Sequence, residues 1–412
     1  MQSPATLRGA MCIAGAFLSF VLLPLASAEW NQWLGPNRDG KSSETGLLAV
    51  WPESGPKQVW QVESLGAGYS SLAVNSGTLF TQGVKNGKQF LIALDAETGE
   101  TVWETEHGKP YSNRRGGGPR GTPTVDDGRV YALGGDGNLI CADATTGAKI
   151  WEKHLLKTYG ARNINWGISE SPLIDGNRII VNAGGRGASI VALDKATGKE
   201  LWKTQSDEAG YSSGVAVEID GVRQYLFFTG EAAVGVLASN GELLWRYRPV
   251  SNSTANVATP IVRDNLVFFS SSYGTGCALL RLESTGGSTT ASEVYFNRDM
   301  RNHYSSSVLI DDHLYGFSGR ILTAMEFETG ELAWRDRSVG KGQMIYADGR
   351  FYILSDDGVV GLVEPDPSEY REVSRFEIGS RDFPTWTLPV ISDGTLYLRD
   401  QERLYAYSIK AP

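Results

Sequence analysis

The chain has 412 residues, with 47 acidic and 38 basic side chains and a formal net charge of −9. This excess of acid disfavours binding to nucleic acid or to an anionic membrane surface. Three cysteines are too few for a disulfide-stapled scaffold. We therefore expect no nucleic-acid partner.

Residues 1–28 have the pattern of a secretory signal peptide. Arg8 precedes an apolar run from Ala10 to Leu25, and residues 26–28 read Ala-Ser-Ala, a small-x-small cleavage site. The alternative is a membrane anchor, but the run of about 15 residues is shorter than the roughly 20 of a spanning helix. We predict a periplasmic or secreted protein whose mature chain has no transmembrane segment.

Residues 29–55 precede the first predicted strand and form an N-terminal extension. It contains Trp30, Trp33 and Trp51. We expect it to lie over one face of the domain that follows, although its spacing does not indicate which face.

An eleven-residue phrase recurs along the rest of the chain. It runs from Ala93 to Trp103 (ALDAETGETVW) and returns from Ala192 to Trp202 (ALDKATGKELW). Weaker copies end at Trp151, Trp245 and Trp334. A phrase that recurs every 40 to 50 residues, roughly, indicates a stacked or radial array of one small unit.

Each unit also carries a tight turn between two β-rich segments. Asp-Gly and related pairs supply the positive φ angles of two-residue hairpins. The eight turns are Ser76-Gly77, Asp127-Gly128, Asp175-Gly176, Asp220-Gly221, Asp264-Asn265, Asp311-Asp312, Asp348-Gly349 and Asp393-Gly394. Together with the Thr-Gly turn of the phrase, they predict eight units of four short strands.

The two ends of the repeat domain, residues 56–412, indicate a closed ring. The last unit, from Thr385 to Ile409, has three strands, whereas the segment from Pro56 to Val62 is a lone strand that carries Trp60. Pairing the lone strand with the last unit covers every exposed edge. We predict an all-β fold, an eight-bladed β-propeller of four-stranded antiparallel blades. An open solenoid or a β-helix would leave the displaced strand unexplained.

The pattern Ala-x-Asp-x-x-Thr-Gly-x-x-x-Trp resembles the tryptophan-docking motif of the PQQ-like (quinoprotein alcohol dehydrogenase-like) β-propellers. The resemblance is carried by Asp95, Thr98, Gly99 and Trp103 and by their repeats, and it covers essentially the whole predicted mature chain. It implies that these tryptophans pack between blades. Some members of the family are dehydrogenases that hold pyrroloquinoline quinone and Ca²⁺ in the central funnel. Others are outer-membrane assembly scaffolds that bind proteins without a cofactor, so function depends on the site.

The chain departs from both patterns. It lacks the adjacent cysteine pair of the alcohol dehydrogenases, and their calcium-binding Glu, Asn and Asp cannot be placed on it. It also lacks the lipidated cysteine of the scaffolds. We therefore assign no catalytic residue and no metal ligand, and leave the cofactor unknown, with quinone and Ca²⁺ tied to the dehydrogenase interpretation.

The segments that lead into the innermost strands predict a ligand site. Because side chains alternate along a strand, five residues should point alike toward the rim of the funnel. They are Tyr69, Arg120, Tyr211, Tyr304 and Trp386. An aromatic ring with one arginine suits a planar or sugar-like ligand. The alternative is that these residues only fill a crowded axis.

Glu170 stands where other units have Ser or Gly. A carboxylate in a funnel needs a counter-charge, so we predict a pair with Arg120 in preference to a metal site. Loops rich in Arg, Asn and Trp add Asn165, Trp166 and His303 to the candidate ligand-binding set.

We predict an exported binding or assembly module whose funnel rim takes a protein or carbohydrate ligand. The alternative is a small quinoprotein dehydrogenase that oxidises an alcohol or a sugar.

Overall fold

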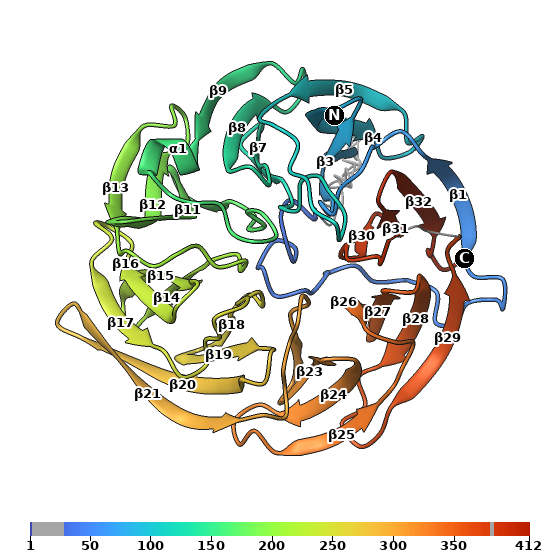
Figure 1. The fold of residues 1–412 in the computed structure, drawn as a ribbon. Coiled ribbons are helices and arrows are strands. Elements are labelled where there is room, and N and C mark those ends of the chain that lie inside the picture. The colour runs from blue at the N-terminus through green and yellow to red at the C-terminus, as the bar shows by residue number, and fades with distance from the viewer. Residues whose placement is uncertain (2–28, 380–382) are drawn as a thin grey trace.

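The structure, a computed structural model, describes residue 1, residues 29–379 and residues 383–412. The predicted signal peptide, apart from Met1, lies outside these residues. Within them, no helix has the length and apolar character needed to cross a membrane. The described chain forms eight four-stranded antiparallel sheets in a ring, which confirms the predicted eight-bladed β-propeller (Figure 1).

The first four blades follow one another around the ring. From the innermost strand outward they are β2 (Ala73–Asn75), β3 (Thr78–Lys85), β4 (Lys88–Asp95) and β5 (Thr101–Glu106) in blade 1; β6 (Thr124–Asp126), β7 (Arg129–Leu133), β8 (Asn138–Asp143) and β9 (Lys149–His154) in blade 2; β10 (Leu173–Asp175), β11 (Arg178–Gly185), β12 (Ala188–Asp194) and β13 (Glu200–Thr204) in blade 3; β14 (Val215–Ile219), β15 (Val222–Phe228), β16 (Ala233–Leu237) and β17 (Leu243–Tyr247) in blade 4. A short helix, α1 (Leu155–Tyr159), follows β9.

The other four blades complete the ring. They are β18 (Ile261–Arg263), β19 (Leu266–Ser271), β20 (Gly276–Thr285) and β21 (Ser288–Asn297) in blade 5; β22 (Val308–Ile310), β23 (His313–Ser318), β24 (Ile321–Glu326) and β25 (Leu332–Asp336) in blade 6; β26 (Gly342–Ala347), β27 (Arg350–Ser355), β28 (Val359–Glu364) and β29 (Arg371–Glu377) in blade 7; β30 (Val390–Ser392), β31 (Thr395–Asp400), β32 (Arg403–Ser408) and β1 (Lys57–Val62) in blade 8.

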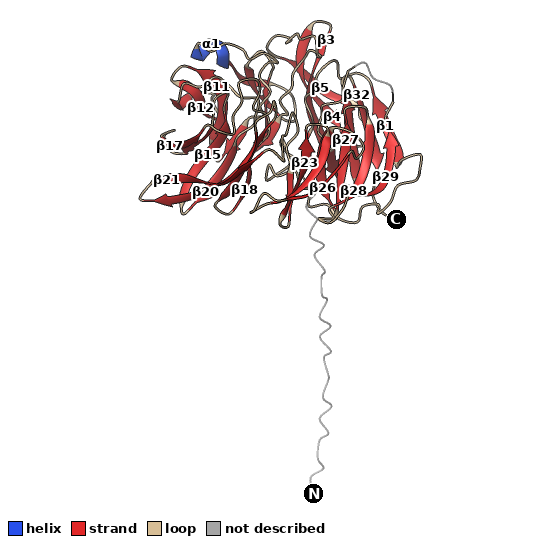
Figure 2. Cartoon of the chain, turned by 60° about the horizontal axis from the view of Figure 1, so that its bottom comes forward, coloured by secondary structure: helices blue, strands red, loops and turns tan. Residues whose placement is uncertain are grey.

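The predicted tight turns join the first two strands in seven of the eight blades. In blade 3 the turn is Gly176-Asn177, one residue later than predicted, because Asp175 pairs with Arg178 within the sheet. Ser76 and Gly77 have φ angles of 49° and 74°, and Asp127 and Gly128 have 51° and 69°. These left-handed angles match the twist of two-residue hairpins. We call the face that carries these turns the turn face. The opposite face carries α1 and the segments that lead into the innermost strands, and we call it the loop face (Figure 2).

The Asp and Thr of the repeated phrase organise the turn before each outermost strand. The Asp95 carboxylate accepts hydrogen bonds from the backbone N–H of Thr98 at 2.8 Å and from its hydroxyl at 2.9 Å. These bonds to Thr98 lower the pKa of Asp95. Asp143 and Asp194 hold their turns in the same way, so the phrase is a local turn device.

The tryptophan of the phrase docks on the next blade. Trp103 Nε1 donates to the Ala144 carbonyl at 3.1 Å, and a Cβ on Gly147 would meet the Trp103 ring at 2.6 Å. The same donation joins Trp60 to Ala96, Trp151 to Lys195, Trp202 to Ala238 and Trp334 to Asp366. Each docking tryptophan thus buries its ring against the neighbouring blade.

The junction between blades 4 and 5 is built differently. Trp245 packs edge-on against Phe269 of blade 5, but its Nε1 donates to Gln224 of its own blade at 2.9 Å. The long hairpin of β20 and β21 extends beyond the ring beside β17 (Figure 1). It contacts blade 4 through the Ser284 backbone N–H, which donates to the Asp220 carboxylate at 2.8 Å.

The ring closes through the N-terminal strand, as predicted. β1 pairs with β32 in antiparallel register, with Trp60 opposite Ala406 and Val62 opposite Leu404. Trp60 then docks on Ala96 of blade 1 at 3.2 Å. The strand therefore completes blade 8 and fastens it to blade 1.

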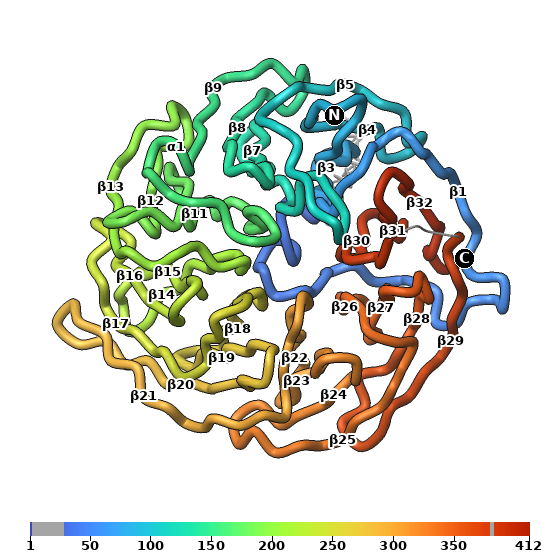
Figure 3. The backbone as a smooth tube through the Cα atoms, in the orientation of Figure 1, coloured from blue at the N-terminus to red at the C-terminus, as the bar shows by residue number. Residues whose placement is uncertain are grey.

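The N-terminal extension lies across the turn face and crosses the centre of the ring (Figure 3). Trp30 bridges to Val74 of β2, and Tyr346 of β26 donates to the Gly40 carbonyl at 2.8 Å. Further along, the Glu44 carboxylate accepts from Gly394 N–H, in the blade 8 turn, at 2.8 Å. The extension is therefore part of the packed domain.

Candidate functional site

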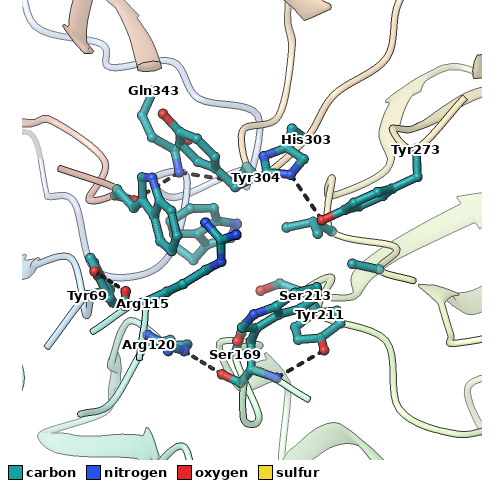
Figure 4. Close-up of a pocket in the computed structure, with 15 residues that line it drawn as sticks. Tyr69, Arg115, Arg120, Ser169, Tyr211, Ser213, Tyr273, His303, Tyr304 and Gln343 are labelled. Carbon is teal, nitrogen blue, oxygen red and sulfur yellow. Dashed lines mark hydrogen bonds between the residues drawn. The ribbon is translucent and has the colours of Figure 1, made fainter. Parts of the chain in front are cut away.

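The loop face is hollowed at the axis by a cavity of about 340 Å³, which we call the funnel pocket (Figure 4). Its lining comes from all eight blades, or the segments that lead into them, and from the extension. The lining residues are Trp33, Tyr69, Arg115, Arg120, Trp166, Ser169, Tyr211, Ser213, Ala255, Val257, Tyr273, His303, Tyr304, Gln343 and Trp386. Eight of these fifteen side chains are aromatic when His303 is counted, which is the composition of a site for an apolar or ring-bearing group.

One wall of the pocket is a stack of aromatic rings. Trp386 lies 5.0 Å from Tyr69 and 5.6 Å from Tyr304, centroid to centroid, with interplanar angles of 29° and 33°. A cation covers each end of the stack: Arg120 lies 5.0 Å from the Tyr69 ring and Lys341 lies 4.3 Å from the Tyr304 ring. Offset stacking and cation–π contacts both stabilise such an array.

The opposite wall is formed by Trp166 and Tyr211, whose rings lie 5.7 Å apart. The Tyr211 hydroxyl accepts from the Trp166 N–H at 3.2 Å, and Arg120 donates to the Trp166 carbonyl at 2.5 Å. Burial raises the pKa of Tyr211 to about 12, so the hydroxyl stays protonated at neutral pH.

The extension closes the pocket toward the turn face. Trp33 lines the pocket and donates through Nε1 to the Thr259 hydroxyl at 3.0 Å. Arg38, which is 5% exposed, donates to the carbonyls of Ser171, Pro172 and Gly214 around the axis. Burial lowers the pKa of Arg38 to about 10, so it remains charged at neutral pH. The funnel is therefore a blind pocket, not an open channel.

A chain of titratable side chains runs along the rim over blades 5 to 7. Lys341 Nζ lies 2.8 Å from His303 Nδ1, and His303 Nε2 lies 3.0 Å from the Tyr273 hydroxyl. The Tyr304 hydroxyl donates to Asp356. Burial, together with the charges of Lys341 and Arg115, lowers the pKa of His303 to about 4. His303 is therefore neutral at physiological pH, accepts from Lys341 at Nδ1 and donates to Tyr273 at Nε2.

Arg115 is an exposed cation of the pocket lining, and Figure 4 shows its guanidinium at the centre of the cavity. Its backbone carbonyl accepts the Tyr69 hydroxyl at 2.6 Å, which anchors the loop that carries it. Within the described residues its side chain forms no ion pair. None of the fifteen lining residues is acidic, so the pocket favours a negative or neutral ligand.

The structure brings most of the predicted site residues together. Seven of the nine line the funnel pocket: Tyr69, Arg120, Trp166, Tyr211, His303, Tyr304 and Trp386. The five that should point alike by strand alternation are all among them. Asn165 lies instead in the lining of a neighbouring cavity, and Glu170 lines neither cavity.

Glu170 corrects the sequence prediction, because it does not pair with Arg120. It is 1% exposed, and its Oε1 accepts from the Asn182 backbone N–H at 2.6 Å inside blade 3. Ser169 occupies the register that faces the funnel, so the next side chain points the other way. Burial raises the pKa of Glu170 to about 8, against the Asn182 hydrogen bond and the charge of Arg38. A single buried carboxylate also offers too few oxygens for a metal site.

Sequence reasoning missed four lining residues that shape the pocket. Arg115 belongs to a basic loop that the sequence did single out. Trp33 lies in the extension, whose docking has no periodic signal, and Tyr273 lies in the turn between β19 and β20. Gln343 of blade 7 donates to the Trp386 carbonyl at 3.2 Å. It was missed because blade 7 has no aromatic residue at the position that Tyr69 or Tyr304 occupies in its own blade.

The donor set does not fit a calcium–quinone centre. Ca²⁺ takes six to eight oxygen ligands, several of them carboxylates. The pocket lining has no Asp or Glu. Within the described part of the chain, no three His, Cys, Asp or Glu side chains come close enough together to hold a metal ion. We therefore derive no redox step through a quinone in this pocket.

One family model, described as outer membrane protein assembly factor BamB, matches the chain over residues 43–163 and again over residues 88–335. These matches cover more than half of the 412 residues. The chain belongs to this PQQ-like, BamB-type family. No curated protein sequence matches it significantly.

Solved structures with the same fold come from both branches of the propeller family. BamB from Moraxella catarrhalis is 17% identical with a TM-score of 0.61, and the match covers 86% of this chain and 99% of that one. Quinohemoprotein alcohol dehydrogenase from Comamonas testosteroni is 12% identical with a TM-score of 0.65, over 93% and 81%. The computationally designed Ika8 protein is 12% identical with a TM-score of 0.57, over 85% and 100%. At these identities the matches establish the fold alone.

Proposed function

We propose that the protein is an exported binding and assembly module that takes a segment of a partner protein into the funnel pocket. The observation that carries this proposal is a blind aromatic pocket with two arginines and no acidic residue in its lining. A pocket of this kind can hold a large side chain of a partner, and its lining offers no carboxylate to bind a metal.

The aromatic stack is the expected source of affinity. Large, rigid rings in a desolvated centre dominate protein interfaces, and the surrounding contacts mainly exclude water. Trp386 lies at the middle of the stack, between Tyr69 and Tyr304. Trp33 at the base prevents a ligand from passing through the axis. These features support a pocket for one anchor residue of an extended partner.

Family membership supports the same proposal. The family description names an outer membrane protein assembly factor, which supports a role in contact with other proteins. The rim loops that surround the funnel pocket come from several blades, as expected for a surface that recognises a partner on a rigid ring.

A display screen of short linear peptides tests this function. Labelled hits would be measured by fluorescence polarisation against the mature chain and against Trp386→Ala, with Tyr346→Ala of the turn face as the matched aromatic control. We expect Trp386→Ala to weaken binding by about tenfold or more, which corresponds to about 1.4 kcal/mol, and Tyr346→Ala to leave it unchanged. The proposal would be contradicted by peptide hits whose affinity is unchanged in Trp386→Ala, or by a screen that yields no hits.

The dehydrogenase alternative has a direct test. The protein would be mixed with pyrroloquinoline quinone and Ca²⁺ and desalted, and its absorbance would be read for retained quinone. Dye reduction would then be measured with alcohols and sugars. We expect neither retention nor turnover, and retention with turnover would overturn the binding-module proposal.

A further inference from the structure

A second cavity of about 430 Å³ adjoins the funnel pocket on the loop face. It lies between blades 3 and 4, along residues 160–165, 184–186, 206–210 and 252–256. We call it the polar groove. The two cavities share Tyr211 and Ala255 in their linings. Asn165 lines the groove, and the next residue, Trp166, lines the pocket. A ligand in the pocket can therefore continue into the groove past Tyr211.

The groove differs in chemistry from the pocket. Tyr211 is the single aromatic residue of its lining, and the rest is dominated by Asn, Ser, Thr and Gly. Four asparagines line it, Asn163, Asn165, Asn252 and Asn256. The amides of Asn163, Asn252 and Asn256 bond to backbone carbonyls of the protein itself. The exposed Asn165, Ser253 and Thr254 add polar side chains to the lining. Such side chains suit a polypeptide backbone, since each peptide unit presents one donor and one acceptor.

The wall of the groove is pre-organised by its own hydrogen bonds. The Asn252 amide oxygen accepts from the backbone N–H groups of Thr254 and Ala255, each at 2.8 Å. Asn256, which is 1% exposed, donates from its amide to the Thr229 carbonyl at 2.8 Å. A wall held in this way loses little conformational entropy when a ligand binds.

The groove also carries unpaired positive charge. Arg162 and Arg186 are exposed in its lining, and in the described ranges neither forms an ion pair. Arg115 extends this charge into the adjoining pocket. Glu208 is the one acidic residue of the groove. Unpaired cations gathered on one face of a chain with net charge −9 indicate a binding surface for an acidic partner.

We propose that the partner segment is an acidic peptide with one large apolar anchor residue. The anchor occupies the funnel pocket, and the acidic residues beside it lie along the polar groove, where Arg162 and Arg186 pair with their carboxylates. This inference rests on the proposed binding function and specifies the chemistry of the partner. Charge complementarity favours the acidic sequence, and the change from aromatic lining to amide-rich lining across Tyr211 separates the anchor from the charged stretch.

Matched labelled peptides test the inference by fluorescence polarisation. One peptide carries a tryptophan followed by glutamates, a second has glutamines in their place, a third has lysines, and a fourth keeps the glutamates but has alanine for tryptophan. We expect the first to bind about tenfold more tightly than the second, and the third and fourth to bind weakly. Because the charges are exposed, the preference for glutamate should shrink as salt is added.

Variants separate the groove from the pocket. In Arg162→Ala/Arg186→Ala the glutamate and glutamine peptides should bind equally, whereas Arg337→Ala, an exposed loop-face arginine that lines neither cavity, should keep the preference. Circular dichroism would verify that each variant is folded. Equal binding of the two peptides to the unmodified protein, or a preference that survives the double substitution, would overturn the acidic-peptide inference.

The outcomes distinguish this inference from the function beneath it. If binding depends on Trp386 but the glutamate and glutamine peptides bind equally, the acidic-peptide inference is wrong and the proposed binding function is still supported. If no anchored peptide binds, while an acidic oligosaccharide binds with dependence on Arg162 and Arg186, both the peptide inference and the protein-binding function fall.

Discussion

The outer edge of the ring and its centre use the same eight blades in opposite ways. At the edge, Trp60, Trp103, Trp151 and Trp202 repeat one contact, an indole N–H that donates to a carbonyl of the next blade. At the centre, equivalent strand entries present Tyr69, Arg120, Ser169, Tyr211, Tyr304, Gln343 and Trp386. Repetition at the edge supplies the ring, and variation at the centre supplies a site.

The edge and the centre also differ in how far apart in the chain their contacting residues lie. Edge contacts are made within a blade or between neighbouring blades, so each can form from a short stretch of chain. The pocket needs contacts across the ring, such as the Trp33–Thr259 hydrogen bond over 226 residues. Substitutions at the edge should therefore cost stability and spare binding. Substitutions in the pocket lining should weaken binding, and those of the buried residues around the axis, such as Arg38, should cost stability.

The largest expected effect is at the edge contact that closes the ring. Trp60→Ala removes the indole that joins blade 8 to blade 1, and Trp→Ala at packed sites costs about 3–5 kcal/mol. We expect about 3 kcal/mol less stability in urea denaturation, because Trp60 is only partly buried. A loss below about 1 kcal/mol would mean that the strand, not the indole, holds the ring closed.

Arg38→Ala should have the next largest effect and belongs to the centre. The substitution leaves the carbonyls of Ser171, Pro172 and Gly214 without their shared donor, and unsatisfied buried groups cost about 1–3 kcal/mol. We expect about 2–3 kcal/mol less stability by chemical denaturation. Lys41→Ala, at an exposed 4.0 Å ion pair of the same extension, is the control and should change stability by under about 0.5 kcal/mol.

Two glycines of blade 2 sharpen the comparison, because both have left-handed backbones but Gly128 lies in the inner hairpin and Gly147 lies at the edge contact. Gly128 has φ of 69° with open space around a Cβ, whereas at Gly147, with φ of 71°, a Cβ would meet the Trp103 ring at 2.6 Å. Alanine should cost about 1 kcal/mol at Gly128 from backbone strain alone. At Gly147 it should cost at least about 1 kcal/mol more, since the docked indole must move. Equal shifts in thermal unfolding would contradict the docking role of Gly147.

The last prediction depends on pH and concerns Glu170. Burial raises the pKa of Glu170 from 4.5 to about 8 in the folded chain. The folded state therefore holds a proton that the unfolded state has lost, and this group makes stability fall as pH rises from 4.5 to about 8. Glu170→Gln mimics the protonated form and keeps an acceptor for Asn182. It should match the unmodified protein near about pH 5 and be more stable near about pH 8 in thermal unfolding.

A gain in stability for Glu170→Gln that is the same at both pH values would contradict a titrating, buried Glu170. A loss at both would mean that the carboxylate is charged in the folded chain and balances Arg38. Either result would change the account of how the centre of the ring is held.

Particular residues show which parts of the fold and of the pocket could be predicted from the sequence. Pairs such as Asp127-Gly128 predicted hairpins correctly because a turn is decided by its own two residues. Alternation along the strand entries placed Tyr69, Tyr211, Tyr304 and Trp386 in one cavity. The same rule, applied one residue further, would have turned Glu170 away from the funnel. Its charge favoured a pair with Arg120, and this interpretation was wrong.

The sequence by itself determined eight blades, their hairpins and their docking tryptophans, since these depend on short-range chemistry repeated at a regular spacing. The strand that closes the ring could also be predicted, because the last unit lacks its fourth strand, although β1 and β32 lie at opposite ends of the chain. Only the tertiary structure decided that Trp33 and Arg38 close the axis, that Arg115 reaches the pocket and that an amide-rich groove adjoins it. Those features join residues far apart in the chain, without any repeat, so their positions follow from packing around the completed ring.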